Sequence, residues 1–137
     1  MKNMVDALKK NVKGKVILPG DSNYDEARKI YNAMIDKYPA IILQCENEDD
    51  VIEGVKFGNA NKMDVSIKSG GHNGAGLSLV DKGLVIDLSN MKKITIDPKK
   101  RTAVIQAGCK LNDVDKATHE HGLALPMGIN STTALQD

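Results

Sequence analysis

A glycine-rich stretch, IKSGGHNGAG at residues 67–76, holds the residues best suited to chemistry in this sequence. Consecutive glycines after a strand let the chain turn sharply and leave backbone N–H groups uncovered, because glycine reaches positive φ freely and has no Cβ. Concave arrays of such N–H groups bind anions, above all phosphate. The alternative is a solvent-exposed turn. His72, inside this run of glycines, is a poor candidate for packed core, and a cofactor held by the loop would lie within its reach.

The two common nucleotide-binding loops do not fit this spacing. The Walker loop ends in Gly-Lys-Ser/Thr, which GGHNGAG lacks. The dinucleotide fingerprint needs a third glycine three residues after Gly-x-Gly, but Leu77, Ser78 and Leu79 follow Gly76. The stretch is therefore a candidate anion-binding loop of another kind.

Other polar residues have simpler explanations than a reactive site. The sequence HEH at 119–121 lacks the spacing that places two histidines on one helix face, so it indicates a solvated helix end rather than a metal site. Asp81, Asp87 and Asp97 fall at predicted strand ends or turns, where aspartate commonly bonds the local backbone. We therefore predict no metal and assign no catalytic residue.

The composition is that of one ordinary domain of 137 residues. The 19 Lys and Arg residues nearly balance 18 Asp and Glu, and the few aromatic residues argue against a nucleic-acid surface. No apolar run is long enough to span a membrane, and MKNMVDALKKNVKG does not resemble a signal peptide. Cys45 and Cys109 are interpreted as small core or surface residues. We expect a cytoplasmic protein with reduced thiols.

Hydrophobic spacing predicts two helices before the first buried strand. The first covers residues 1–10. The second begins after Ser22 or Asn23, either of which can act as N-cap, and ends before Pro39. The apolar residues of the second helix recur at helical spacing: Ala27, Ile30, Tyr31, Met34 and Ile35.

A strand–helix–strand unit is predicted to lead into the glycine-rich stretch. AIILQ (40–44) is a short buried strand, Asn47 opens a helix that ends near residue 60, and DVSIK (64–68) is the next strand. The helix is expected to face inward with Val51, Ile52 and Val55. This order favours a parallel pair of strands joined by a right-handed crossover.

After the glycine-rich stretch the pattern changes to strands joined by tight turns. Three segments are candidate strands: 83–89, 93–97 and 101–108. A helix from Leu111 is expected to end at Gly122, a natural left-handed terminator. We therefore predict an α+β (α/β) fold, with a strand–helix–strand subdomain at 1–68 and the start of a mainly antiparallel sheet with a flanking helix at 69–137.

Residues 67–108 resemble the first flavin-binding segment of the FAD-linked oxidases of the berberine-bridge and 6-hydroxynicotine oxidase type, in the vanillyl-alcohol oxidase superfamily. The shared pattern is a basic residue, Ser, Gly-Gly-His, a further Gly, IDLS-x-M and an Asp-Pro turn. Residues 14–72 are similar to the N-terminal subdomain of that family, and GLALPMGINSTTA (122–134) is similar to its next flavin-contacting segment. The similarity covers roughly residues 12–134 and implies an incomplete PCMH-type FAD-binding fold.

The resemblance implies that FAD is the cofactor and that the glycine-loop backbone binds its pyrophosphate. The residues that match the family's cofactor-binding positions are Lys68, Ser69, Gly70, Gly71, His72, Asn73, Gly74, Gly76, Gly128, Asn130, Ser131 and Thr132. Lys68 stands where Arg is frequent, which keeps the charge but loses the planar fork. His72 matches the histidine that in many members bonds covalently to the 8α-methyl of the flavin. A second cysteine link, found in some members, would fall at Asn130 and is not expected.

The resemblance also implies a function. Such enzymes oxidise amines or alcohols by hydride transfer to the flavin. Relatives continue with a substrate domain that this chain lacks, so we expect a truncated FAD-binding domain over 1–137, with a small-molecule substrate only where another domain completes it. The alternatives are a non-catalytic remnant, an interaction module or one piece of a split enzyme. An uncovered sheet edge predicts a homo-oligomer.

Overall fold

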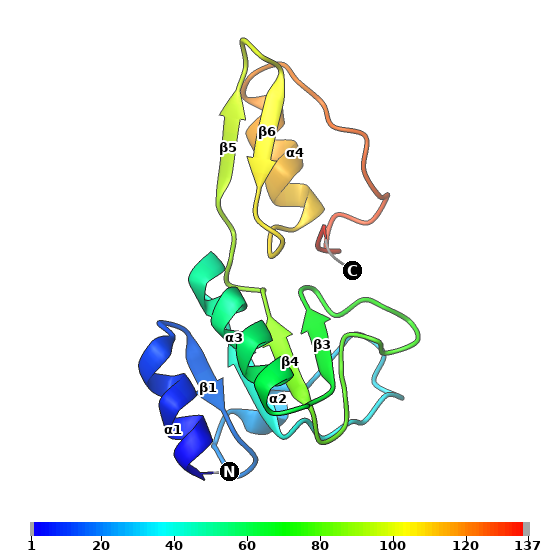
Figure 1. Ribbon diagram of the computed structural model, residues 1–137. Coiled ribbons are helices and arrows are strands. Elements are labelled where there is room, and N and C mark those ends of the chain that lie inside the picture. The colour runs from blue at the N-terminus through cyan, green and yellow to red at the C-terminus, as the bar shows by residue number, and fades with distance from the viewer. Residues whose placement is uncertain (1, 136–137) are drawn as a thin grey trace.

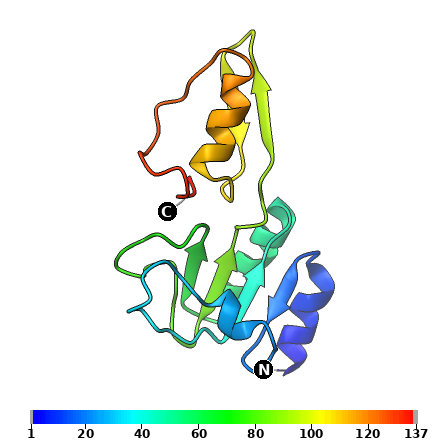
Figure 2. The same cartoon turned by 180° about the vertical axis from the view of Figure 1, so that it is seen from behind.

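The computed structural model describes residues 2–135, and these form a mixed helix-and-sheet fold, as the sequence predicts (Figure 1, and from behind Figure 2). The helices are α1 (Lys2–Asn11), α2 (Tyr24–Ala27), α3 (Glu48–Ala60) and α4 (Leu111–His119). The strands are β1 (Lys15–Ile17), β2 (Ile41–Gln44), β3 (Val65–Lys68), β4 (Leu84–Asp87), β5 (Ile94–Asp97) and β6 (Thr102–Ile105). None of the helices among these residues is both long and apolar enough to cross a membrane.

A four-stranded sheet of order β1-β2-β4-β3 forms the larger part of the molecule. Strands β2 and β3 both pair in parallel with β4, and β1 pairs antiparallel with β2. The two strands of the predicted strand–helix–strand unit are thus parallel, as expected, but β4 separates them. Leu84, Val85 and Ile86 are completely buried, which explains why β4 is apolar at consecutive positions rather than at alternate ones.

The core lies on both faces of this sheet. On one face, Leu43 and Ile86 pack with Val5 and Leu8 of α1 and with the partly buried Val51 of α3. On the other face, residues of β1, α2 and the loop before β4 pack with residues of β2 and β4. This cluster consists of Ile17, Tyr24, Ala27, Ile42, Leu79 and Val85. Strand β3 therefore belongs to a sheet that has a hydrophobic core on each face. This sheet fixes the point from which the chain after β3 begins.

Helix α3 rests on the sheet through glycines, which corrects the predicted inward face. Ile52 and Val55 are 50% and 51% exposed, whereas Gly54 and Gly58 are buried. A Cβ at Gly54 would lie 2.8 Å from Leu43 Cδ2, so the helix approaches the sheet too closely for any side chain there. The predicted start of the helix is confirmed, because the side chain of Asn47 accepts a hydrogen bond from Asp50 N at 3.0 Å.

The second predicted helix is much shorter than the apolar spacing indicated. Helix α2 ends at Ala27, and residues 30–38, which we call the strap, are irregular. Two isoleucines of the strap pack against a distant part of the chain instead of continuing a helix face, because Ile30 lies against Gly71 and Ile35 against Gly76. Arg28 closes the end of α2, and hydrogen bonds to Asp36 and Asp25 raise its pKa.

Beyond β4 the chain builds a smaller unit of one hairpin and one helix. Strands β5 and β6 pair antiparallel, and α4 packs beside them (Figure 1). Gly122, with φ of +64°, follows α4 as the expected left-handed terminator. Strand β4 was predicted to belong with this antiparallel part, but it pairs in parallel in the first sheet. The change from parallel to antiparallel pairing therefore falls between β4 and β5, and the first sheet extends past residue 68.

Candidate functional site

The glycine loop, residues 69–76, starts at the carboxyl end of β3 and is anchored there by two buried polar side chains. Lys68 Nζ donates to Ala27 O at 2.7 Å and lies 3.6 Å from Asp87 Oδ2. Ser69 Oγ donates to Ala107 O at 2.6 Å. Both residues are buried, and both side chains are bound to protein. In the site predicted from the sequence, these two residues therefore fix the base of the loop.

The first half of the loop offers backbone donors. The N–H groups of Gly70, His72, Asn73 and Gly74 make no hydrogen bond to any residue within 2–135. A run of amide donors without protein partners is the feature that binds anions in glycine-rich loops. Gly71, with φ of +74°, makes the left-handed turn inside this run.

In the second half of the loop, the backbone N–H groups are hydrogen-bonded within the loop, to Asn73. The side-chain oxygen of Asn73 accepts hydrogen bonds from Ala75 N and Leu77 N, both at 3.1 Å, and its backbone oxygen accepts one from Gly76 N at 3.0 Å. The position of Gly76 requires glycine because of its backbone angle and its packing, not because its amide is exposed. Its φ is +67°, and a Cβ there would lie 2.6 Å from Ile35 Cγ2. The donors open to a ligand are thus those of Gly70, His72, Asn73 and Gly74.

His72 projects from the loop and stacks on a strap residue. The ring of Tyr31 lies 4.6 Å from the imidazole between centroids, with an angle of 19° between the planes. Neither ring nitrogen of His72 hydrogen-bonds to a residue that the structure describes, and the side chain is partly exposed. One face of the imidazole is therefore covered, while its nitrogens remain open to a ligand. Sequence analysis missed Tyr31, because it lies 41 residues upstream inside a segment interpreted as helix.

The second predicted segment, residues 128–134, docks on the start of α4. Leu111 N donates to Thr133 O at 3.0 Å, and Asn112 N donates to Ser131 O at 3.1 Å. Asn130 Oδ1 accepts from both the N–H and the hydroxyl of Thr132, at 3.1 and 2.8 Å. These bonds hold the segment in a tight turn on the helix N-terminus, where free N–H groups need acceptors.

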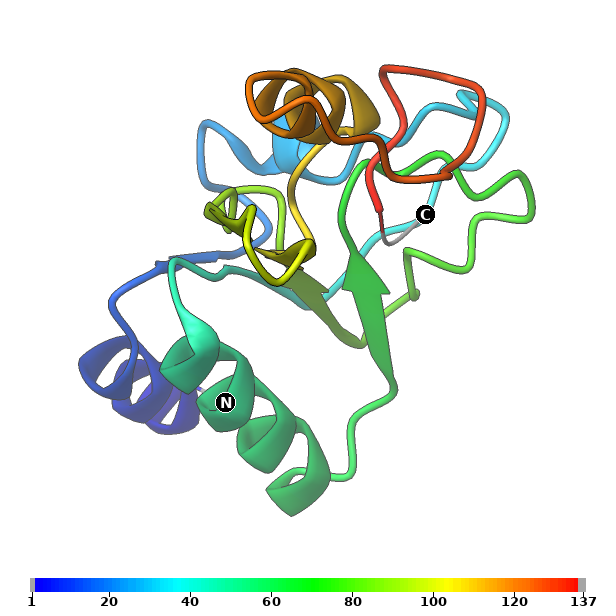
Figure 3. The same cartoon turned by 90° about the horizontal axis from the view of Figure 1, so that it is seen from above.

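The two predicted segments lie on the same side of the molecule. The C-terminal end of the chain faces the carboxyl end of β3 and the glycine loop in Figure 1, and the three segments gather together when seen from above in Figure 3. Gly128, Asn130, Ser131 and Thr132 are all exposed there. The structure thus brings the residues predicted from positions 69–76 and 128–132 to one side, although just over fifty residues separate them in sequence.

The thiols take no part in this site. Cys45 and Cys109 are buried and unpaired. Burial, with a smaller contribution from Asp50 and Asp87, raises the pKa of the Cys45 thiol to about 12. Burial also raises the pKa of Cys109. Because the thiolate is the reactive form, both behave as small core residues, as the sequence indicated.

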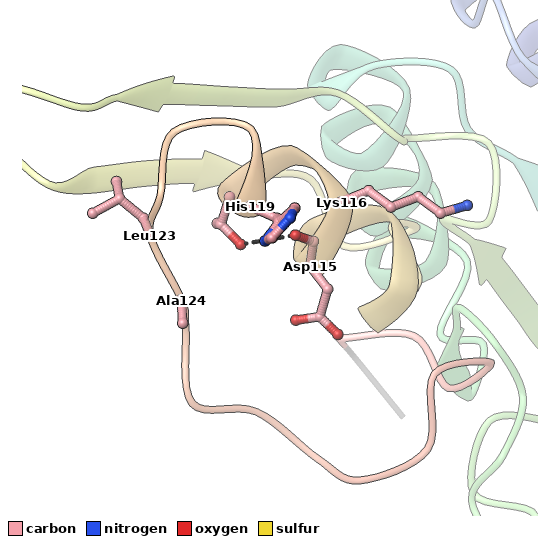
Figure 4. Close-up of a pocket in the computed structure, with 6 residues that line it drawn as sticks. Asp115, Lys116, His119, Leu123 and Ala124 are labelled. Carbon is pink, nitrogen blue, oxygen red and sulfur yellow. Dashed lines mark hydrogen bonds between the residues drawn. The ribbon is translucent and has the colours of Figure 1, made fainter.

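The HEH sequence lies near a shallow pocket on the other unit. Asp115, Lys116 and His119 of α4 line it together with Leu123 and Ala124 (Figure 4). Within residues 2–135, no group of three His, Cys, Asp or Glu side chains is placed to hold a metal ion. None of the lining residues belongs to the glycine loop or to the segment 128–134, so this pocket is separate from the candidate site.

Comparison with known proteins agrees with this geometry. The FAD binding domain family matches residues 39–135, which include the glycine loop and the segment 128–134. The FAD-linked oxidoreductase YgaK of Bacillus subtilis is 37% identical over 127 residues, covering 93% of this chain and 28% of YgaK. The (R)-6-hydroxynicotine oxidase of Paenarthrobacter nicotinovorans is 33% identical over 120 residues, covering 88% of this chain and 26% of that enzyme.

The fold is also that of a solved flavoenzyme. The crystal structure of 6-hydroxy-D-nicotine oxidase from Arthrobacter nicotinovorans superposes with a TM-score of 0.86 and 32% identity, over 90% of this chain and 27% of that one. The chain therefore spans between a quarter and a third of the length of these relatives. With the family match over most of its length and the same fold, the chain belongs to the FAD-binding domain family of the FAD-linked oxidoreductases.

Proposed function

We propose that FAD binds with its pyrophosphate against the open N–H groups of Gly70, His72, Asn73 and Gly74. The observation that carries this proposal is the division of the loop, in which Gly70, His72, Asn73 and Gly74 keep their donors open while Ala75 to Leu77 do not. A diphosphate offers several acceptor oxygens and negative charge, which suits such a row of peptide dipoles.

The other predicted site residues have supporting roles in this proposal. Lys68 and Ser69 fix the base of the loop, and Gly71 and Gly76 supply its left-handed turns. The exposed segment with Gly128, Asn130, Ser131 and Thr132 provides the second wall, near the flavin ring or the pyrophosphate.

His72 is the proposed attachment point for the flavin. Its ring nitrogens are open and its face is held by Tyr31, so one of them would be available to hold the flavin at the 8α-methyl of the isoalloxazine. That bond would replace a methyl C–H bond, and the two electrons would pass to the flavin ring and from it to dioxygen. The flavin, once bound, supplies hydride acceptance. A covalent bond to the chain prevents loss of the cofactor when the protein is unfolded.

The activity of a longer protein is a further part of the proposal. In it, the chain is the FAD-binding part of an oxidoreductase that oxidises an amine or an alcohol, with the substrate held by another domain. The support is that relatives sharing this fold are three to four times as long. The second candidate is a flavin-binding module without turnover, because no described side chain around the glycine loop is placed as a catalytic base. Turnover of an amine or an alcohol by a longer protein that contains this chain and a substrate-binding domain would favour the first candidate.

Titration with FAD and acid precipitation test the cofactor site. We expect the purified chain to bind FAD and to retain yellow colour in the acid pellet, and we expect His72→Ala to lose that retention but to keep reversible binding. His121→Ala is the matched control, because His121 is an exposed histidine after α4. A chain that takes up no added FAD contradicts the proposed site, and retention by His72→Ala contradicts the attachment point.

Self-association and a cytoplasmic location complete the proposal. Strand β3 is an edge of the four-stranded sheet, and its outward residues Val65 and Ile67 are 42% and 46% exposed. An apolar strand edge is a pairing surface for a second copy. Light scattering that gives a monomer at all accessible concentrations contradicts self-association. The cytoplasmic location remains a prediction from the unpaired cysteines.

A further inference from the structure

The strap holds the glycine loop and the turn after it by their carbonyl groups. Tyr31 N donates to Gly71 O at 2.9 Å. Asn32 Nδ2 donates to Gly74 O at 3.0 Å. Lys37 Nζ donates to both Gly76 O and Leu79 O, each at 2.9 Å. Four carbonyl groups between residues 71 and 79 therefore point toward residues 30–38.

This arrangement orients the peptide planes of the loop. In a trans peptide, the carbonyl of one residue and the N–H of the next point in opposite directions. Because the Gly71 carbonyl points to Tyr31 N, the N–H of His72 points away from the strap. The bond from Tyr31 thus leaves the His72 N–H open on the opposite side, whereas the N–H groups that follow the Gly74 and Gly76 carbonyls, those of Ala75 and Leu77, are bonded to Asn73.

Apolar packing seats the loop on the same segment. A Cβ at Gly71 would lie 3.2 Å from Ile30 Cγ2, and one at Gly76 would lie 2.6 Å from Ile35 Cγ2. Both glycines have positive φ, so they are the points at which the loop bends onto the strap. This packing explains the irregular path of residues 30–38. A helix there would move Ile30 and Ile35 away from the two glycines, and it would move the side chains of Asn32 and Lys37 away from the loop.

We propose that Asn32 and Lys37 are positioning residues for diphosphate binding. They preorganise the glycine loop by holding the Gly74, Gly76 and Leu79 carbonyls. The cationic Lys37 bonds are the stronger of these, since charge-assisted hydrogen bonds exceed neutral ones. This inference rests on the proposed FAD site, but it concerns residues that lie outside the glycine-rich motif.

Binding measurements on the purified chain test the inference, with FAD and ADP as the two probes. Both ligands carry a diphosphate, and only FAD carries a flavin. We expect Lys37→Met to weaken both by a similar factor, roughly tenfold, and Lys37→Arg to restore most of the affinity. Asn32→Ala removes one neutral bond to the loop, together with the bond from Met34 N to Asn32 Oδ1 inside the strap. It is expected to weaken both ligands by a smaller factor, so it tests the loop even where Lys37→Met fails to fold.

The matched control is Lys29→Met. Lys29 lies next to the strap, its side chain is 69% exposed, and among residues 2–135 it pairs only with Glu26, so its loss removes the same charge without touching the loop. We expect affinities equal to those of the unsubstituted chain. An equal loss in Lys29→Met would assign the effect to net charge and overturn the positioning role.

Hydrogen exchange of the chain without ligand gives a readout that does not depend on binding. The amides of Ala75, Gly76 and Leu77 are bonded to Asn73, and we expect them to exchange faster in Lys37→Met while the amides of β4 do not change. Unchanged exchange, or loss of FAD affinity without loss of ADP affinity, overturns the inference and leaves the proposed FAD site standing. An unsubstituted chain that binds neither probe overturns both.

Discussion

The four-stranded sheet and the hairpin unit of β5, β6 and α4 carry the two walls of the candidate site, but they are built differently. The sheet has a core on both faces, and the β4 residues Leu84, Val85 and Ile86 are fully buried. The hairpin is covered by α4, and the β6 residue Val104 is 74% exposed. The glycine loop therefore follows a strand of the sheet with a core on both faces. The segment 128–134 is attached to the hairpin unit, which α4 covers.

This difference in packing shows how one site can combine a firmly held segment, the glycine loop, with a more weakly held one, the segment 128–134. The glycine loop is fixed from below by Lys68 and Ser69 and from the side by the strap, over several bonds that are distant in sequence. The segment 128–134 is fixed to α4 mainly by bonds of its own backbone. Loops held by fewer long-range contacts open at lower free energy. We expect the second wall to adjust to the ligand held by the first.

Core truncation gives the largest expected contrast between the two units. Ile86→Ala should lower the free energy of unfolding by about 3 kcal/mol, because it leaves a cavity in a fully buried strand. Val104→Ala should change it by no more than about 0.5 kcal/mol, since the side chain is already exposed. Urea unfolding of both variants checks this pair. Equal losses would contradict the difference in packing.

A buried carboxylate gives the next largest effect, inside the sheet unit. Asp50 is 1% exposed and accepts hydrogen bonds from the N–H groups of Lys13, Gly14 and Glu46 at 2.8–2.9 Å. Asp50→Ala should cost roughly 2–3 kcal/mol, because these donors lose their acceptor. The neighbouring exposed Asp49 is the matched control, and Asp49→Ala should leave the urea midpoint almost unchanged. A similar loss in both would show that helix charge, rather than the bonds, matters.

A polar bond between the two units gives the smallest effect and a pH signature. Gln106 Nε2 donates to Glu48 Oε1 at 2.9 Å, and this bond holds the pKa of Glu48 below its ordinary value. A lowered carboxyl pKa stabilises the folded state above the ordinary Glu value, and this contribution is lost as the pH falls through the lowered pKa. Gln106→Ala should therefore lower the thermal midpoint more at pH 7 than at pH 3, because the bond from Lys93 N to Gln106 Oε1 is lost at both pH values and the bond to ionised Glu48 only at the higher one. A loss of equal size at both pH values would contradict it.

Local features of the sequence predicted the parts of the fold that local chemistry decides. Asn47 caps α3 as expected, and Gly122 follows α4 in the left-handed conformation. The strands at 41–44 and 65–68 match the apolar segments interpreted as strands. The glycine loop was predicted from backbone freedom and from its resemblance to a flavin-binding segment, and both depend on contiguous residues.

The errors concern contacts between residues far apart in sequence. The apolar spacing from Ala27 to Ile35 fits a helix, but Ile30 and Ile35 pack under glycines about forty residues later. Ile52 and Val55 had the spacing of an inward face, but Gly54 and Gly58 lie on the sheet because they allow a closer approach. Strand order is likewise non-local, so β4 could not be placed between β2 and β3 from its own residues. Tyr31 was missed for the same reason.

The side chain of Asn73 competes with any bound anion for N–H groups of the glycine loop and of Leu77 after it. Its amide oxygen already occupies the donors of Ala75 and Leu77, so an anion arriving there would have to displace a group tethered to the same chain. At Gly70, His72 and Gly74 the arriving oxygen displaces only solvent. In the proposed site, one uncharged side chain would therefore restrict phosphate binding to the first part of the eight-residue loop, without itself contacting the phosphate.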